Sequence, residues 1–274
     1  MSKVVISRRS FVAGALAAPA FAVAVQRASA AEGYTGYVMG AQSYSFRHFK
    51  FAESLTKLKE LGLNNMEFCS AHFPPDASAP GFADVKKTIE GSGVKVVAFG
   101  VENFTKDDAA NRKKFEFAKA LGIGILSASP APDSFDSLDS LCKEFNIKIA
   151  IHNHGPNDKL YGLVANTLKA IEGRGPMIGA CVDTGHVIRS GEKPHEVVKA
   201  LGARVHSLHL KDWIFNGEEQ IPGNGELDMP ALARELKALK FTGPIDLEYE
   251  KSEENPVPDM RIGLKNWEDA CKKA

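Results

Sequence analysis

Four residues that can bind a divalent cation directly follow short apolar runs in the second half of the chain. They are two histidines and two acids: His152 after IKIAI, Asp183 after MIGACV, His209 after RVHSL and Glu248 after PIDL. Two imidazoles and two carboxylates form a suitable ligand set for zinc, manganese, iron(II), cobalt or nickel. A single polar residue after a strand is usually only solvated, so the prediction of a metal site depends on all four occurring together.

Strand alternation separates these residues from other nearby histidines, because successive side chains of a strand point to opposite faces. His154 has the same parity as His152 but lies further toward the following loop, which favours contact with a substrate. His206 lies three residues before His209. It should therefore face away from the site and be packed and hydrogen-bonded.

The acidic stretch PIDLEYE contains three carboxylates of the same parity, Asp246, Glu248 and Glu250. Choosing among them requires a judgement of how deep in the barrel each carboxylate lies. Glu248 is the expected ligand and Glu250 the next candidate. Polar or aromatic residues after other strands could contact substrate, although each could equally be solvated, hydrogen-bonded or packed. These further candidates are Glu67, His72, Glu102 and Trp213.

The elements that must position these residues alternate between apolar runs and helical segments. Leu138, Leu141, Cys142 and Phe145 repeat with helical spacing. Helical segments end in glycine at 62, 122 and 202, and asparagine at 146 can play the same role, since both residues accept the left-handed conformation that ends a helix. Eight apolar runs lie between such segments: VMGAQSYSF, NNMEF, VKVVAFGV, GILSAS, IKIAIH, MIGACVD, RVHSLHL and PIDLEYE.

These short runs, apolar on both faces and separated by helices, are typical of parallel strands buried on both sides. Eight such units in roughly 240 residues predict an α/β fold, a single-domain (β/α)8 TIM barrel. A doubly wound open sheet is the alternative, but no glycine-rich phosphate turn follows the first run. In a barrel, chemistry takes place where the strands end, so the four candidate ligands would meet at one mouth.

The first thirty residues are expected to be a cleavable export signal rather than part of the barrel, which then covers residues 31–274. Arg8 and Arg9 precede an apolar, alanine-rich run that ends in ASA at 28–30, an order typical of a twin-arginine signal peptide. The apolar run of about fifteen residues is shorter than the roughly 20 that span a bilayer. We therefore expect a periplasmic protein with no stable membrane anchor after cleavage.

Composition limits the partners. Lysine plus arginine total 34 and aspartate plus glutamate total 34, so no net field attracts nucleic acid or an anionic membrane. A small neutral or weakly charged ligand fits this balance better. The cysteines have no paired spacing, which indicates neither a zinc knuckle nor a disulfide framework; they are Cys69, Cys142, Cys181 and Cys271.

Nearly all of the predicted barrel resembles the xylose isomerase-like superfamily, in particular its sugar phosphate isomerase/epimerase group. The motifs that carry the resemblance are DTGH at 183–186, HLKD at 209–212, PGNGELD at 222–228 and LEYE at 247–250. The resemblance implies one divalent metal ion (manganese, zinc, cobalt or iron) held at the ends of the fifth to eighth strands. The matching positions are His152, Asp183, His209 and Glu248.

The resemblance also implies the chemistry. Such enzymes move a proton at a carbon beside a carbonyl, and a cation that stabilises the enediolate makes that C–H acidic enough for a carboxylate such as Glu248. His186 matches a substrate-binding residue and Lys211 lies in a pocket-lining loop; His154, His186 or Lys211 would protonate a departing oxygen. The expected substrate is a small sugar or keto-sugar, and export argues against a sugar phosphate.

One departure from the family pattern changes the expected mechanism. The family usually has glutamate where this chain has His152, and a metal-bound histidine cannot also act as the proton-transferring base. Two-carboxylate epimerisation is thereby weakened, whereas isomerisation through Glu248 remains, as does β-elimination from a keto-sugar or keto-glycoside. Further alternatives are a non-catalytic sugar-binding barrel and a structural protein without a site. The balanced charge and the expected export argue against the superfamily's DNA-cleaving endonucleases.

Overall fold

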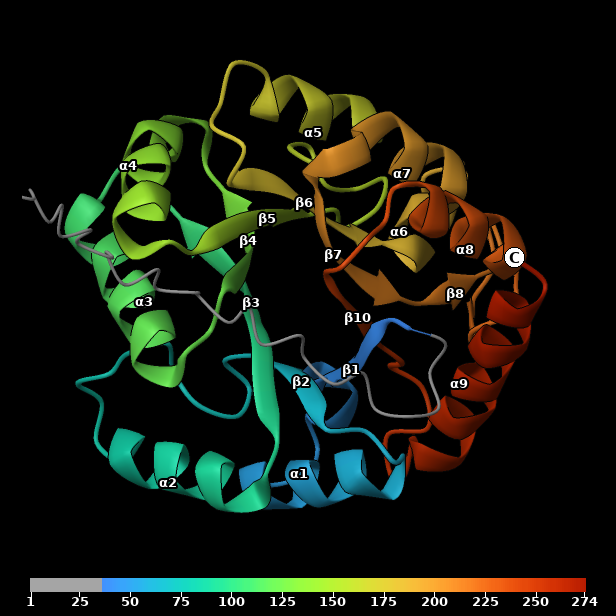
Figure 1. Cartoon of the computed structure of the whole chain (residues 1–274), viewed down its shortest axis with the longest axis horizontal. Coiled ribbons are helices and arrows are strands. Elements are labelled where there is room, and N and C mark those ends of the chain that lie inside the picture. The colour runs from blue at the N-terminus through green and yellow to red at the C-terminus, as the bar shows by residue number, and fades with distance from the viewer. Residues whose placement is uncertain (1–35) are drawn as a thin grey trace, which may run out of the picture.

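Eight parallel strands close on themselves in the computed structural model, which describes residues 36–274 (Figure 1). Around the barrel the order is β1, β10, β7, β6, β5, β4, β3 and β2, so the first strand pairs with both the second and the last. The prediction of a TIM barrel is confirmed. The strands are β1 (Val38–Gln42), β2 (Asn65–Phe68), β3 (Lys95–Phe104), β4 (Ile125–Pro130), β5 (Lys148–His152), β6 (Ile178–Asp183), β7 (Val205–Leu210) and β10 (Pro244–Leu247).

Helices surround the strands, as the view in Figure 1 shows. Three short 3-10 helices accompany them: η1 (Ser43–Phe46), η2 (Pro132–Ser134) and η3 (Gly202–Arg204). The α-helices are α1 (Phe51–Glu60), α2 (Phe82–Ser92), α3 (Asp108–Leu121), α4 (Phe135–Phe145), α5 (Val164–Ile171), α6 (Thr184–Arg189), α7 (Pro194–Leu201), α8 (Met229–Ala238) and α9 (Val257–Lys272).

Left-handed residues end several helices where the sequence predicted them. Gly122 follows α3 with φ 70° and Asn146 follows α4 with φ 56°, and each turns the chain directly toward the next strand. Gly62, one residue beyond the cap of α1, has φ 76°. Because all eight strands run parallel, their carboxyl ends lie at one mouth of the barrel.

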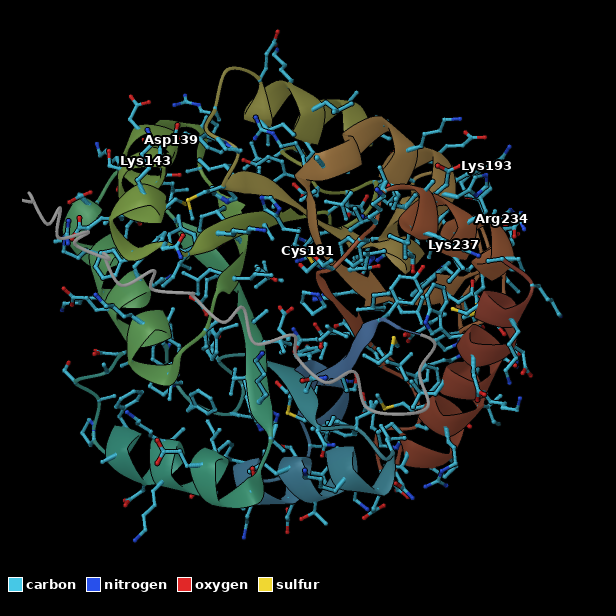
Figure 2. All side chains as sticks on the ribbon, viewed as in Figure 1. Asp139, Lys143, Cys181, Lys193, Arg234 and Lys237 are labelled. Carbon is cyan, nitrogen blue, oxygen red and sulfur yellow. The ribbon has the colours of Figure 1, made fainter. Side chains whose placement is uncertain are left out.

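The main core lies between the strands and the helices. The predicted stripe of α4 is buried at Leu138, Leu141 and Cys142. Charged side chains of the helices lie at the perimeter of the ring, whereas Cys181 of β6 lies at its centre; the labelled examples in Figure 2 are Asp139, Lys143, Lys193, Arg234 and Lys237.

Two details differ from the predicted strands. SYSF, expected to continue the first strand, forms η1, because the Gln42 side chain accepts a hydrogen bond from the backbone of Tyr44 and turns the chain. A two-stranded hairpin formed by β8 (Asp212–Trp213) and β9 (Glu219–Gln220) follows β7 and was not predicted.

The predicted signal peptide, residues 1–30, lies outside the described residues. Among the helices of residues 36–274, none combines the length and the apolar character needed to cross a membrane.

Candidate metal centre

The four predicted ligands meet inside the mouth of the barrel. One ligand atom from each of His152, Asp183, His209 and Glu248 lies within 4.8 Å of every other, and all four residues are buried. Neighbouring strands produce this convergence: Asp183 of β6 is in register with His209 of β7, and His152 ends β5. Glu248 directly follows β10, which pairs with β7.

Lone pairs are crowded at the centre of this cluster. The Nε2 atom of His209 lies 3.0 Å from Glu67 Oε2, so in the neutral ring, whose one proton is donated to Glu67, Nδ1 is an acceptor. That Nδ1 atom lies 3.0 Å from His152 Nε2 and 3.0 Å from Glu248 Oε2. Acceptors at this spacing repel one another unless a proton or a cation lies between them.

Other buried atoms of the cluster lack a protein partner. Asp183 Oδ1 accepts a hydrogen bond from the backbone N–H of His186 at 2.8 Å, whereas Oδ2 has none. Oδ2 faces His152 Nε2 at 3.6 Å. A buried carboxylate oxygen without a hydrogen bond is costly, so this side of Asp183 is available for a cation. Two nitrogens and two carboxylates therefore fit one divalent metal ion.

The charges around the cluster keep the acids ionised. Burial opposes ionisation of Glu248, but Lys211 and His209 outweigh it and lower the pKa of Glu248 to about 2. Burial also raises the pKa of Asp183, but the neighbouring histidines and Lys211 hold it well below its usual value. His209 is the converse case: burial lowers its pKa, whereas Cys181, Glu67 and Glu248 raise it well above the usual value. A divalent cation would replace the proton that His209 otherwise holds.

The cluster forms part of the floor of a cavity of ≈ 520 Å³. This volume lies in the range of small-molecule sites and suits a monosaccharide or a small glycoside. The pocket wall contains residues from most of the barrel strands and the loops that follow them, including residues that the sequence did not indicate. The lining residues are Gln42, Tyr44, Cys69, Ser70, Ala71, Gly100, Val101, His152, His154, His186, Arg189, His209, Trp213, Glu219, Glu248 and Glu250.

His186 is held in one tautomer by Arg189. The guanidinium Nη1 lies 2.8 Å from His186 Nδ1, and because arginine can only donate, Nδ1 must accept and the imidazole proton lies on Nε2. Burial lowers the pKa of His186 to about 3, so the ring is neutral near pH 7. Arg189 also lies over the ring of Trp213, 4.7 Å from its centroid. His186 can thus donate one hydrogen bond from Nε2 but is not a cationic acid.

The hairpin over the mouth is anchored on one buried carboxylate. Asp212 accepts hydrogen bonds from the backbone N–H groups of Trp213, Gly223, Gly225 and Leu227, at 2.8 to 2.9 Å. A Cβ atom on residue 225 would lie 2.5 Å from Asp212 Oδ1, which explains the glycine there. The HLKD and PGNGELD motifs are therefore two halves of one loop structure, which carries Trp213 and Glu219 to the pocket.

Comparison with known proteins agrees with this architecture. Residues 55–270 match the family model of the xylose isomerase-like TIM barrel. The chain belongs to this family.

Several proteins similar to this chain have a name or a solved structure. An inosose dehydratase from Clostridium perfringens is 23% identical over 226 residues, covering 70% of this chain and 72% of the relative. Among solved structures, the IolI protein with a bound zinc atom has a TM-score of 0.69 at 16% identity, over 86% of this chain and 98% of that one. The 3-keto-D-glucoside 4-epimerase YcjR from E. coli has a TM-score of 0.67 at 17% identity, over 86% and 100%.

In this xylose isomerase-like barrel, some of the predicted substrate-contacting residues line the pocket. His154, His186 and Trp213 do so. Lys211 lies behind the lining, 1% exposed, where it is paired with Glu250 and lies 3.8 Å from Glu248. Burial lowers its pKa, but the surrounding carboxylates raise it above the usual value, so Lys211 acts as a fixed cation.

Three other candidates for substrate contact do not line the pocket, and each has a partner in the protein. Glu67 is fully buried below the ligands and bonds to His209. Glu102 pairs with Lys114 Nζ at 2.7 Å and accepts from Ser70. His72 Nε2 lies 3.0 Å from the carbonyl oxygen of Ser43. The absence of these three from the pocket lining favours the hydrogen-bonded alternative over substrate contact.

Glu219 is the pocket residue of most chemical interest that the sequence analysis missed. It lies on β9, is 4% exposed, and accepts a hydrogen bond from the backbone of Glu250. Burial raises its pKa to about 7, although Lys211 opposes the shift. A carboxyl group with this pKa can donate a proton near neutral pH. A signal in the sequence was its place between the HLKD and PGNGELD motifs.

Proposed function

We propose that this xylose isomerase-like barrel is a metal-dependent enzyme that removes a proton beside the carbonyl of a neutral keto-sugar or keto-glycoside and then eliminates a β-oxygen. The observation that carries the proposal is the crowding of lone pairs from His152, His209 and Glu248 beside the unpartnered Asp183 oxygen, at the floor of a pocket of suitable size. Such an arrangement is built to hold a cation where a substrate can reach it.

His152, Asp183, His209 and Glu248 would hold the metal ion. When bound, the ion supplies positive charge that stabilises an enolate oxygen and thus acidifies the adjacent C–H. Glu248 lies at the pocket surface and is ionised near neutral pH, so it can accept the proton. Its low pKa makes it a weak base, and for this reason proton removal depends on the acidified C–H.

Protonation of the departing oxygen is assigned to Glu219. The other candidates are poorly suited: His186 is neutral with a pKa of about 3, burial and the neighbouring His152 lower the pKa of His154 to about 4, and Lys211 holds its proton firmly. Glu219, with a pKa of about 7, is half-protonated near neutral pH and lines the same pocket. His186 can orient the substrate through its Nε2–H.

Isomerisation or epimerisation is the second candidate reaction. It shares the first step, after which the proton returns to carbon instead of an oxygen departing. The family relationship supports both outcomes, since its members include a dehydratase and an epimerase by name. His152 in place of a carboxylate leaves Glu248 as the acid group that is both ligand and base, which favours elimination over two-base epimerisation.

The lining charges support a neutral substrate. Glu219, Glu248 and Glu250 face the pocket, and its arginine, Arg189, is already engaged by His186 and Trp213. These carboxylates disfavour a phosphate group. Trp213 offers a flat face for a sugar ring. A periplasmic location, which we also propose, fits free glycosides better than sugar phosphates.

Solvent deuterium exchange tests the proposal. Metal-loaded protein in D2O should incorporate deuterium beside the carbonyl of a keto-cyclitol or a 3-keto-glycoside, and elimination should add the absorbance of a conjugated enone. Glu248→Gln should lower exchange by about 10²- to 10⁴-fold. Glu196→Gln, on the outer surface of α7, is the matched control and should exchange normally. Binding of these ligands without any exchange by the metal-loaded wild type would identify a sugar-binding barrel instead.

A further inference from the structure

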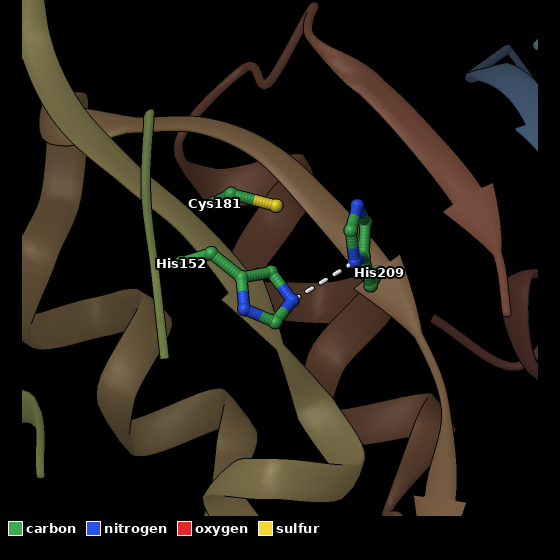
Figure 3. Close-up of side chains that lie close together, drawn as sticks. All are labelled: His152, Cys181 and His209. Carbon is green, nitrogen blue, oxygen red and sulfur yellow. Dashed lines mark hydrogen bonds between the residues drawn. The ribbon is translucent and has the colours of Figure 1, made fainter. Parts of the chain in front are cut away.

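The inner side of the metal centre carries a thiol. Cys181 lies on β6 two residues before Asp183, so its side chain points into the barrel on the same face. One ligand atom from each of His152, Cys181 and His209 lies within 4.8 Å of the other two. Figure 3 shows the sulfur of Cys181 beside the two imidazoles, whose Nε2 and Nδ1 atoms are 3.0 Å apart.

This thiol occupies a small apolar layer in the barrel interior. Cys181 is fully buried, is not part of a disulfide, and clusters with Ala98, Ile125 and Ala150. The neighbours are mostly small, and the polar partners of the thiol are His209 and the hydroxyl of Ser207.

Two ligand sets therefore share one pair of histidines. Toward the pocket, His152 and His209 are joined by the carboxylates of Asp183 and Glu248; toward the interior, they are joined by Cys181. Oxygen ligands suit hard ions such as Mn²⁺, whereas thiolate with imidazole suits Zn²⁺, Cd²⁺ and Cu⁺. The histidine pair itself is compatible with either class.

We propose that His152, Cys181 and His209 form an inner position for a soft metal ion, alternative to the pocket-side position of His152, Asp183, His209 and Glu248. On binding, the S–H bond of Cys181 breaks, a sulfur–metal bond forms and the proton is released to solvent. Because both positions use the same histidines, the centre holds one ion, and the identity of the ion decides whether sulfur is bound. The inference rests on the metal centre of the proposed function and adds a ligand and a metal class to it.

The other thiols provide controls. Cys69 also lines the pocket, but its sulfur lies 3.4 Å from the Ser43 hydroxyl and it belongs to none of the candidate ligand groups found among the described residues. Cys142 is buried on the outer side of the barrel, on α4. Neither should contribute sulfur to a metal held by the two histidines.

Cadmium binding tests the inference. X-ray absorption of the wild type loaded with one Cd²⁺ per chain should show a sulfur ligand, together with a sulfur-to-cadmium charge-transfer band in the ultraviolet. Cys181→Ser should lose both signals and bind Cd²⁺ at least about 10- to 100-fold more weakly. That range is the usual loss of metal affinity when a residue that hydrogen-bonds to a ligand is removed, and losing a ligand itself should cost no less. Its Mn²⁺ affinity should remain that of the wild type, and Cys69→Ser should keep both sulfur signals.

The outcomes separate this inference from the proposed function. Cd²⁺ bound through nitrogen and oxygen alone in the wild type, or sulfur signals that persist in Cys181→Ser, would overturn the inner position while leaving the pocket-side centre intact. Failure of the wild type to bind either Cd²⁺ or Mn²⁺ would overturn both. The wild-type spectrum decides whether sulfur is bound, and the comparison of Cys181→Ser with Cys69→Ser decides which thiol supplies it. Mn²⁺ binding by Cys181→Ser shows that this variant is folded.

Discussion

Polar residues at strand ends behave differently in the two halves of this barrel. In the first half, His72 after β2 and Glu102 near the end of β3 bond to protein groups: a backbone carbonyl for His72, and Lys114 with Ser70 for Glu102. In the second half, after β5 to β10, the polar side chains of the cluster face mainly one another, and Asp183 Oδ2 has no hydrogen bond.

This difference shows what distinguishes a candidate site from an ordinary polar strand end. A residue whose hydrogen bonds are complete stabilises the mouth of the barrel. A group of acceptors that repel one another is stable only if something positive is bound among them. Glu67 is intermediate: it belongs to the first half by sequence, yet its carboxylate supports His209 in the second.

The largest effect on metal binding is expected from a substitution of Asp183, in the second half of the barrel. Asp183→Asn keeps the acceptor for the His186 backbone but loses the charge, so the protein should lose its metal ion and the turnover of a keto-sugar should fall by at least about 10²- to 10³-fold. Metal content by elemental analysis and exchange kinetics measure both. The matched change in the other half, Glu102→Gln, should keep metal and turnover and lower the free energy of unfolding by about 1 kcal/mol. Metal retained in full by Asp183→Asn would contradict the assignment.

A second prediction concerns pH. Burial raises the pKa of Glu219 to about 7, and its protonated form is the acid, so kcat for elimination should fall as the pH rises through about 7. Glu219→Gln should lose this dependence and be slower by about 100-fold below pH 7. Deuterium exchange, which needs Glu248 and the metal ion but not Glu219, should continue. A descending limb that survives unchanged in Glu219→Gln would assign the acid to another group.

The smallest effect is expected from a substitution of Glu67, the residue intermediate between the two halves. Glu67→Gln keeps an acceptor for His209 Nε2 but removes the negative charge behind it, so the histidine becomes a weaker ligand. Metal affinity should fall by about 10- to 100-fold, with turnover restored at saturating metal. Titration of the metal-free protein, followed by activity at each metal concentration, measures the shift. An unchanged affinity would mean that Glu67 only fills the barrel interior.

Much of this arrangement could be predicted from the sequence because it depends on local patterns. The apolar runs and the residues that end helices, such as Gly122 and Asn146, define the alternation of strands and helices, and the barrel then brings His152 and Glu248 together. The alternation of side chains along a strand predicts which face a residue occupies, but not how deep it lies in the barrel. For that reason the sequence left open whether Glu67 contacts substrate or is hydrogen-bonded in the barrel; it lies below the ligands and bonds to His209.

The remaining parts of the site depend on contacts between distant segments. Glu219 reaches the pocket because the hairpin folds back over the mouth, and this fold depends on four backbone N–H groups that converge on Asp212. Arg189 was overlooked because its significance lies in contacts with His186 and Trp213. Neither the spacing of apolar residues nor the alternation of strand side chains predicts contacts between distant segments.

The anchoring of the hairpin on Asp212 has a consequence for how such a barrel could diversify. Trp213 and Glu219 lie on a short segment between β7 and α8, whereas the candidate cation-binding side chains come from the ends of four barrel strands. Exchanging that segment for one of another length or composition would reshape the pocket wall without rebuilding the centre beneath. In the proposed enzyme, the choice of substrate and the acid for the departing oxygen would thus be inherited separately from the metal ligands.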